Sequence, residues 1–250
     1  MALKMNGVWE TTKRKIKVEF NGEIIAETTN GMLMIESLYD MHYYFPEEDV
    51  RTELLVDNGE TNESKYKGTA KVLTLKVGDK VAEDAVWTYP DVKGKRPDMR
   101  GYYAFDWNKM DKWYEEDEEV IGHPRNPYHR VDTINSSRHV RIEVDGKTVA
   151  ESNRPVLLFE TNLPTRYYIP KEDVKVEITP TETHTICPYK GEADYWSFEV
   201  EGKDYQDLMW GYHETFNEVL KIKDLVAFYD EKVDVYIDGE LQGKPRTVFA

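Results

Sequence analysis

The chain has 250 residues, 40% of them hydrophobic and 32% charged, with a formal net charge of −15. This composition is typical of a globular protein, and the excess of negative charge disfavours binding to nucleic acid or to an anionic membrane surface. The single cysteine, Cys187, excludes an intrachain disulfide, and no apolar run approaches the ~20 residues that a membrane-spanning helix needs. Because the first residues also lack the apolar core and cleavage site of a signal peptide, we expect a cytoplasmic protein.

One pattern occurs twice along the chain. The stretch EVDGKTVAE at 143–151 matches EFNGEIIAE at 19–27, an offset of 124 residues, and YKGEA at 189–193 matches YKGTA at 66–70, an offset of 123 residues. The length suits two ordinary domains, each large enough to bury a core without disulfides or metals. We therefore predict two domains in tandem.

The predicted domains are a divergent first copy over residues 1–114 and a second copy over residues 137–250, joined by a linker over residues 115–136. The linker opens with an acidic run, which is typical of a solvated segment. Its second half holds two prolines and a glycine, which favour extended or turn structure. The histidines and aromatic residues in that half indicate that the linker packs on a domain.

Both copies are predicted to consist mostly of β-strands. Asn21-Gly22 and Asp145-Gly146 predict tight type I′ hairpins, because these residue types accept the positive φ angles of that turn. Apolar residues alternate over 73–77 and again over 196–200, which is the period of a strand with one buried face. Helix is scarce, and only residues 215–223 are expected to form about two turns.

Three blocks of the second copy carry a resemblance to a known family. They are RPVLLFET at 154–161, RYYIP at 166–170 and CPYKGEADYW at 187–196, of which the last is the most specific. The linker stretch HPRNPYHRVD at 123–132 is also similar to a segment of that family. The chain resembles a tandem pair of domains of unknown function 427, sometimes labelled nucleotidyltransferase-like. The resemblance covers nearly the whole chain.

The resemblance implies a mainly β fold: two small, twisted antiparallel-sheet domains similar to the tent-like group, with little helix. It implies no established activity. The chain does not match the glycine patterns of P-loop or Rossmann nucleotide sites, so no cofactor is expected. Tent-like relatives often hold zinc with four cysteines, whereas this chain has one, so no metal is expected.

Cys187 is the first candidate for catalysis. It could act as a nucleophile or redox thiol, with Lys190 favouring the thiolate, or it could be a buried thiol that packs as a small apolar group. The first copy has Ser64 at this position, so cysteine chemistry would belong to the second copy alone. Lys190 itself could bind an anion or could be a surface charge.

Glu160 is the second candidate for catalysis. It ends an apolar run, as Glu36 does in the first copy, and could act as an acid or base or anchor a ligand amine. Alternatively, it could lie in water or pair with Arg166. Arg166 is replaced by His42 in the first copy.

Aromatic residues of the second copy are candidate walls of a pocket, because rings with polar groups suit planar or cationic ligands. Those with aromatic counterparts in the first copy could instead be core residues; they are Tyr168, Trp210 and Tyr212. Tyr195 and Trp196 become Val72 and Leu73 in the first copy, so this pair distinguishes the second.

The leading hypothesis is a protein that binds a small polar or planar molecule in a pocket of the second domain. The expected ligand-binding residues are Glu160, Arg166, Tyr168, Lys190, Tyr195, Trp196, Trp210 and Tyr212, with Cys187 nearby. An enzyme that uses Cys187 as nucleophile or Glu160 as acid–base, and a structural tandem-domain protein without a ligand, are the alternatives. The identity of the ligand and the oligomeric state stay open.

Overall fold

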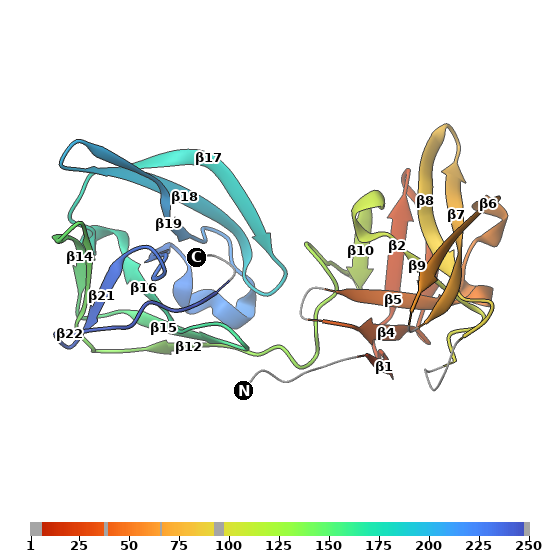
Figure 1. Cartoon of the computed structure of the whole chain (residues 1–250), viewed down its shortest axis with the longest axis horizontal. Helices are drawn as coiled ribbons and strands as arrows, with labels where there is room; N and C mark the ends of the chain where they lie inside the picture. The colour runs from red at the N-terminus through yellow and green to blue at the C-terminus, as the bar shows by residue number, and fades with distance from the viewer. Residues whose placement is uncertain (1–6, 38–39, 66, 93–97, 248–250) are drawn as a thin grey trace. The chain divides into compact units, whose positions relative to one another are not determined.

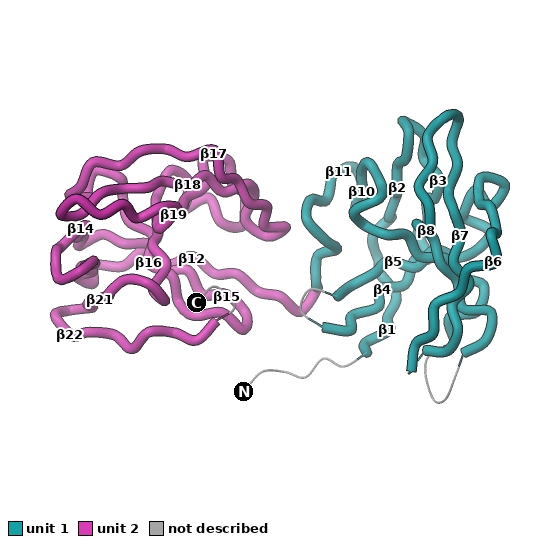
Figure 2. The backbone as a smooth tube through the Cα atoms, turned by 45° about the horizontal axis from the view of Figure 1, so that its top comes forward, with its two compact units in different colours: residues 1–126 teal, residues 127–250 magenta. Residues whose placement is uncertain are grey.

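The chain forms two similar units, each built from one large and one small antiparallel sheet. The computed structural model describes residues 7–37, 40–65, 67–92 and 98–247. The chain divides into units over residues 1–126 and 127–250 (Figure 2), and each unit holds a seven-stranded and a four-stranded sheet. This confirms the prediction of two tandem, mainly β domains (Figure 1). Among the described residues, no helix is long and apolar enough to cross a membrane.

The large sheet of unit 1 has the order β1-β4-β5-β9-β8-β7-β6. Its strands are β1 (Val8–Thr11), β4 (Met32–Ile35), β5 (Met41–Pro46), β6 (Leu55–Ser64), β7 (Gly68–Val77), β8 (Lys80–Thr88) and β9 (Tyr102–Phe105). The small sheet has the order β11-β10-β2-β3, with β2 (Ile16–Phe20), β3 (Glu23–Thr28), β10 (Lys112–Glu115) and β11 (Glu118–Glu119). The described residues of this unit also form three 3-10 turns: η1 (Glu47–Asp49), η2 (Thr52–Leu54) and η3 (Trp107–Lys109).

Unit 2 repeats this order strand for strand, as β12-β15-β16-β20-β19-β18-β17 and β14-β13-β21-β22. The large sheet contains β12 (Val131–Asn135), β15 (Val156–Glu160), β16 (Arg166–Pro170), β17 (Ile178–Cys187), β18 (Gly191–Val200), β19 (Lys203–Gly211) and β20 (Leu225–Phe228). The small sheet contains β13 (Val140–Val144), β14 (Lys147–Ser152), β21 (Asp234–Ile237) and β22 (Glu240–Leu241). The 3-10 turns are η4 (Lys171–Asp173) and η5 (Asn217–Ile222).

The hairpin predicted from the repeat is present once in each unit. Asn21 and Gly22 have φ angles of 53° and 75°, and Asp145 and Gly146 have 48° and 76°. Positive φ at both central residues is the requirement of the type I′ turn. The two hairpins also share a register shift at the equivalent position in β2 and β13. The repeat therefore extends to the local backbone.

Each large sheet buries apolar side chains on both of its faces. One face packs against the small sheet, as Phe45 does in unit 1 and Ile169 does in unit 2. The opposite face carries a second cluster, which includes Tyr44 in unit 1 and Tyr168 in unit 2. Because successive residues of a strand point to opposite faces, β5 and β16 supply both cores.

The expected linker over residues 115–136 contains strands, and the expected helix over residues 215–223 is not α-helical. The expected linker contributes β11, which pairs with β10, and β12, which pairs with β15 at the edge of the second large sheet. The expected helix over residues 215–223 is shorter and takes the 3-10 form of η5, with non-helical backbone angles at Val219. Val219 and Ile222 are nevertheless buried, Val219 against the second cluster of unit 2, whereas Leu220 is 53% exposed.

Candidate functional site

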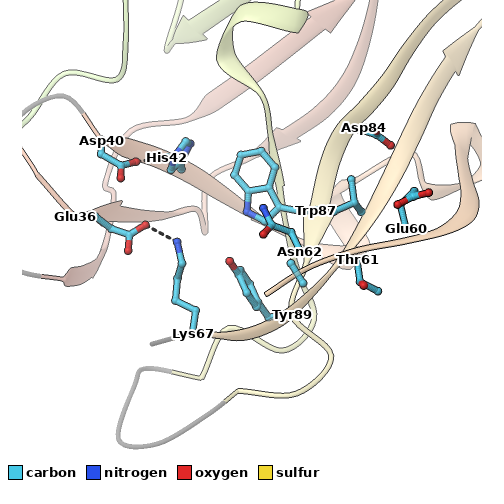
Figure 3. Close-up of a pocket in the computed structure, with 12 residues that line it drawn as sticks. Glu36, Asp40, His42, Glu60, Thr61, Asn62, Lys67, Asp84, Trp87 and Tyr89 are labelled. Atoms are coloured by element: carbon cyan, nitrogen blue, oxygen red, sulfur yellow. Dashed lines mark hydrogen bonds and ion pairs between the residues drawn. The ribbon is translucent and has the colours of Figure 1, made fainter. Parts of the chain in front are cut away.

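Unit 1 holds a hollow of about 550 Å³ on the face of its large sheet that lies opposite the small sheet (Figure 3). Strands β5 to β8 and the turns beside them provide the side chains. The charged and ionisable residues that line the hollow are Glu36, Asp40, His42, Glu60, Lys67 and Asp84. Its apolar and aromatic lining includes Ala70, Val72, Trp87 and Tyr89.

An ion pair between Lys67 and Glu36 forms one side of the hollow (Figure 3). Glu36 directly follows β4, and Lys67 directly precedes β7. The side chains stay partly open to solvent, with 28% of Glu36 and 15% of Lys67 exposed. Burial lowers the pKa of Lys67, but the hydrogen bond to Glu36 and the nearby charges of Tyr89, Glu36 and Asp40 together outweigh it, and the net pKa is raised. Lys67 is therefore a fixed cation at the rim of the hollow.

Trp87 and Tyr89 form the aromatic part of the wall. The indole Nε1 of Trp87 donates a hydrogen bond of 3.2 Å to the hydroxyl of Tyr44, which holds the ring in one orientation. The ring of His42 meets Trp87 edge-on, with 5.0 Å between centroids. The ammonium of Lys67 lies 5.8 Å from the centre of the Tyr89 ring. The wall thus offers ring surface beside fixed charges, an arrangement that suits planar or cationic ligands.

The hollow favours positive over negative charge. Four carboxylates line it, against one lysine and one histidine. Burial lowers the pKa of His42 despite its hydrogen bond of 2.9 Å with Asp40, so this imidazole is mostly neutral at neutral pH. Glu60 and Asp84 lie on the far side of the hollow from the Lys67–Glu36 pair (Figure 3).

Unit 2 has the same ion pair in a closed setting. Lys190 Nζ donates to Glu160 Oε2 at 2.5 Å, and His129 Nε2 lies 3.0 Å from Glu160 Oε1. Only 10% of the Lys190 side chain, 6% of Glu160 and 4% of His129 are exposed. The His129 ring also stacks on Tyr189, with centroids 3.9 Å apart. Residues of the expected linker therefore cover the ion pair of this unit.

This setting decides how Glu160 can act. Burial raises its pKa, but the hydrogen bonds and charges of His129 and Lys190 together outweigh burial, and the net pKa is lowered. A carboxyl group with a lowered pKa is ionised at neutral pH and is a poor general acid. Glu160 pairs with Lys190 and His129 rather than with Arg166, the partner considered from the sequence.

A glycine fixes the turn that carries Lys190. Gly191 has a φ of +116°, and a Cβ at this position would lie 2.6 Å from the carbonyl oxygen of Glu214. Only glycine tolerates both the backbone angle and this close approach. Gly68, beside Lys67, has a φ of +111°. The glycine after each lysine therefore has a positive φ in both units.

The space in unit 2 that corresponds to the hollow contains additional rings. Tyr168 accepts a hydrogen bond of 3.2 Å from Trp210, the same bond that Tyr44 and Trp87 make. The Tyr195 hydroxyl lies 2.9 Å from Thr185 Oγ1 and 3.3 Å from the hydroxyl of Tyr229. The Tyr229 ring lies 4.6 Å from that of Trp210.

The additional rings of unit 2 replace smaller residues of unit 1. Unit 1 has Val72 where unit 2 has Tyr195, and Asp106 where unit 2 has Tyr229. Tyr212 lies in the same cluster of unit 2, with its ring 6.4 Å from that of Tyr168. Burial raises the pKa of Tyr212 well above its usual range, so its hydroxyl stays protonated.

Arg166 forms a buried ion pair instead of facing Glu160. Its guanidinium donates two hydrogen bonds to Glu231, of 2.9 Å and 2.6 Å, and lies 3.6 Å from Asp230. It also lies 5.5 Å from the Trp210 ring. Burial, with Glu231 nearby, raises the pKa of Asp230 to about 7 despite the attraction of Arg166. Arg166 is thus occupied by protein carboxylates.

Tyr195 and Trp196 do not form one pocket wall. Tyr195 belongs to the cluster around Trp210, whereas Trp196 packs against the core shared with the small sheet. Neighbouring residues of a strand point to opposite faces, so the pair is separated by β18 itself. The ammonium of Lys171 lies 4.1 Å from the centre of the Trp196 ring.

Cys187 ends β17 and packs partly buried against the same cluster as Tyr168 and Tyr212. No residue within the described ranges makes a hydrogen bond to its sulfur. His184, three residues away, is held instead near Asp194, at 3.2 Å. The geometry therefore provides no base for a cysteine nucleophile among the described residues.

Three residues of the buried ion pairs in unit 2 were not predicted from the sequence. His129 was taken only as part of a linker that packs on a domain, and neither Asp230 nor Glu231 was singled out. Their signal was weak, because His129 is 31 residues from its partner Glu160 and Glu231 is 65 residues from Arg166. The hollow of unit 1 was not predicted, because aromatic residues are more numerous at the corresponding positions of the second copy.

Comparison with known proteins identifies the family. No curated protein matches the chain. The pattern of the domain of unknown function DUF427 matches residues 8–116 and again residues 132–239. These two matches cover most of the chain, and each lies within one of the two units and ends before the last described strand of that unit. The chain therefore belongs to the DUF427 family and carries that domain twice.

Proposed function

We propose that this protein binds a small molecule in the hollow of its first domain. The observation that carries the proposal is the contrast between the copies at Val72 and Tyr195. The hollow of about 550 Å³ lies within the range of roughly 300–1,000 Å³ that small-molecule sites occupy. Sequence reasoning assigned the pocket to the second domain, but the support lies in the first.

The lining suggests how a ligand would be held. The Lys67–Glu36 pair and the rings of Trp87 and Tyr89 combine directional polar groups with apolar surface, as ligand sites usually do. The excess of carboxylates disfavours anions such as phosphate esters. We therefore expect a neutral or positively charged molecule with at least one flat face.

Native mass spectrometry of the purified protein, followed by a thermal-shift screen of metabolites, tests this function. A ligand that binds only the folded state raises the melting temperature by mass action. Val72→Tyr, which copies the residue of the second domain, should abolish the shift by filling the hollow. Val81→Tyr is the matched control, because Val81 is exposed and does not line the hollow.

Compounds that stabilise the wild type and Val81→Tyr but not Val72→Tyr would support the proposal. If every stabilising compound acts equally on Val72→Tyr, the hollow is not the binding site.

A further inference from the structure

Each copy has an equivalent carboxylate that pairs with a lysine, and the two sites differ in one further contact. Glu36 and Glu160 stand at equivalent positions in the two copies. One oxygen of each carboxylate accepts a hydrogen bond from a lysine, which is Lys67 for Glu36 and Lys190 for Glu160. Each carboxylate has a second oxygen that can accept a further hydrogen bond. The contact made by that second oxygen is where the two copies differ.

In the second domain an imidazole occupies this position. His129 Nε2 lies 3.0 Å from Glu160 Oε1, and the ring stacks on Tyr189 with an interplanar angle of 21°. Its Nδ1 is buried without a hydrogen-bond partner among the described residues. The ring is therefore held by one nitrogen and one face, with its other nitrogen unused.

In the first domain the position has no described occupant. The second oxygen of Glu36 accepts no hydrogen bond from the residues that the structure describes, and Glu36 borders the hollow. Met5 stands at the position equivalent to His129 (129 − 124) and lies outside the described residues. The stretch MALKMNG before β1 contains no histidine, so it cannot supply an imidazole.

We propose that the ligand of the first domain presents the N–H of a flat, imidazole-like nitrogen ring to Glu36, and that His129 is the built-in counterpart of this ligand in the second domain. The inference rests on the proposed function of the hollow and names the class of molecule that the hollow takes. A ring N–H donated to a carboxylate makes a charge-assisted hydrogen bond, which is stronger than a neutral one. If the ring is protonated, the carboxylates of the lining favour it further.

The second domain allows a direct test by chemical rescue. His129→Ala removes the built-in ring, so added imidazole should bind in its place and raise the melting temperature of this variant more than that of the wild type. His139→Ala is the matched control, because His139 also hydrogen-bonds a carboxylate, Glu151, but is partly exposed. Imidazole that stabilises both variants equally, or neither, would overturn the assignment of His129 as a ligand counterpart.

The first domain is tested in the wild-type chain, so the result does not depend on the folding of His129→Ala. Imidazole is titrated at about pH 9, where a ring with an ordinary pKa of about 6.5 is neutral. The indole signal of Trp87 in ¹H–¹⁵N spectra reports on the hollow. We expect imidazole to shift this signal and 1-methylimidazole, which has no N–H to donate, to leave it unchanged.

Glu36→Gln should weaken imidazole binding at the Trp87 signal by about tenfold or more, because it removes the charged acceptor. Glu160→Gln should leave that signal unaffected. Equal binding of imidazole and 1-methylimidazole, or no effect of Glu36→Gln, would overturn the inference.

The failure of this inference is distinguishable from failure of the proposed function. If imidazole does not bind but other compounds stabilise the wild type and not Val72→Tyr, the hollow is a site for another class of ligand. If no compound discriminates Val72→Tyr from Val81→Tyr, the proposed function fails as well.

Discussion

The two domains share one framework and differ in what occupies the space above it. The hydrogen bond from Trp87 to Tyr44 in the first domain has the same length, 3.2 Å, as that from Trp210 to Tyr168 in the second. Around this common bond, the first domain leaves a hollow, whereas the second adds the ring of Tyr195. The larger aromatic residue of the second domain thus fills the space that the smaller residue of the first leaves open.

Residues that interact with each other in one domain are replaced together in the other. Arg166 of the second domain faces Glu231, whereas His42 of the first faces Asp40. The position equivalent to Glu231 is Asn108 (231 − 123), so the first domain lacks both members of the buried pair. A buried charge without its partner is strongly destabilising, which explains why the two residues differ together.

The largest expected effect is the loss of stability when the buried cation of the second domain is removed. Arg166→Ala leaves Glu231 and Asp230 buried without their cation and should destabilise the second domain by about 3–5 kcal/mol. His42→Ala removes one hydrogen bond to an exposed carboxylate and should cost about 1 kcal/mol. Denaturant unfolding followed at the indole signals of Trp210 and Trp87 measures the two domains separately. Equal losses would contradict the contrast between buried and open pairs.

The second prediction concerns pH. The pKa of Asp230 is about 7 in the folded protein against an ordinary 3.8, so between these values the folded state holds a proton that the unfolded state has lost. Its contribution to the stability of the second domain therefore falls as pH rises from about 4 to about 7.

Asp230→Asn should remove this dependence and stabilise the second domain by roughly 2–4 kcal/mol at pH 7.5. Glu231 acts in the opposite sense at lower pH, since its lowered pKa adds stability that is lost on acidification. The first domain, with Trp107 at the equivalent position, should not respond to Asp230→Asn. A stability profile for the second domain that Asp230→Asn leaves unchanged between pH 4 and 7 would refute the prediction.

The third prediction concerns the exchange of Val72, which lines the hollow, and Tyr195, its counterpart in the second domain. Tyr195→Val should destabilise the second domain by about 2–3 kcal/mol, because it removes a buried ring and its contacts with Thr185 and Tyr229. Val72→Tyr should change the stability of the first domain by no more than about 1 kcal/mol, because the new ring enters a hollow. Thermal unfolding of both variants provides the measurement. A cost for Val72→Tyr as large as that for Tyr195→Val would show that the first domain has no room for the ring.

The smallest expected effect is at Cys187. Replacing it with serine, the residue of the first domain, should change stability by about 0.5–1 kcal/mol, because the thiol is partly buried and makes no described hydrogen bond. Ligand binding in the first domain should be unaffected. Native iodoacetamide labelling should be slow compared with labelling after unfolding. Rapid labelling of the folded protein would revive the nucleophile hypothesis.

Much of the fold follows from local sequence signals. The Asn21-Gly22 and Asp145-Gly146 turns were predictable because two positive φ angles in a hairpin select these residue types. Gly191 follows the same local rule, since its φ of +116° is one that glycine adopts and other residues rarely do. These features depend on a few neighbouring residues, so the sequence alone carries them.

The site was less predictable because it depends on contacts between distant residues and on filled or empty volume. Lys190 and Glu160 are 30 residues apart, and no periodicity connects them. The sequence showed that Tyr195 replaces Val72, but not whether the added ring walls a pocket or fills one. Only the positions of Thr185 and Tyr229 around its hydroxyl decide this.

The first domain is open at the position where rings fill the second domain. Solvent paramagnetic relaxation, measured on the ring protons of Trp87 and Trp210 with a neutral soluble relaxation agent, tests it most directly. We expect faster relaxation for Trp87, which borders the hollow, than for Trp210, which is buried beside Tyr229 and Arg166. Equal relaxation of the two rings, or faster relaxation of Trp210, would contradict it.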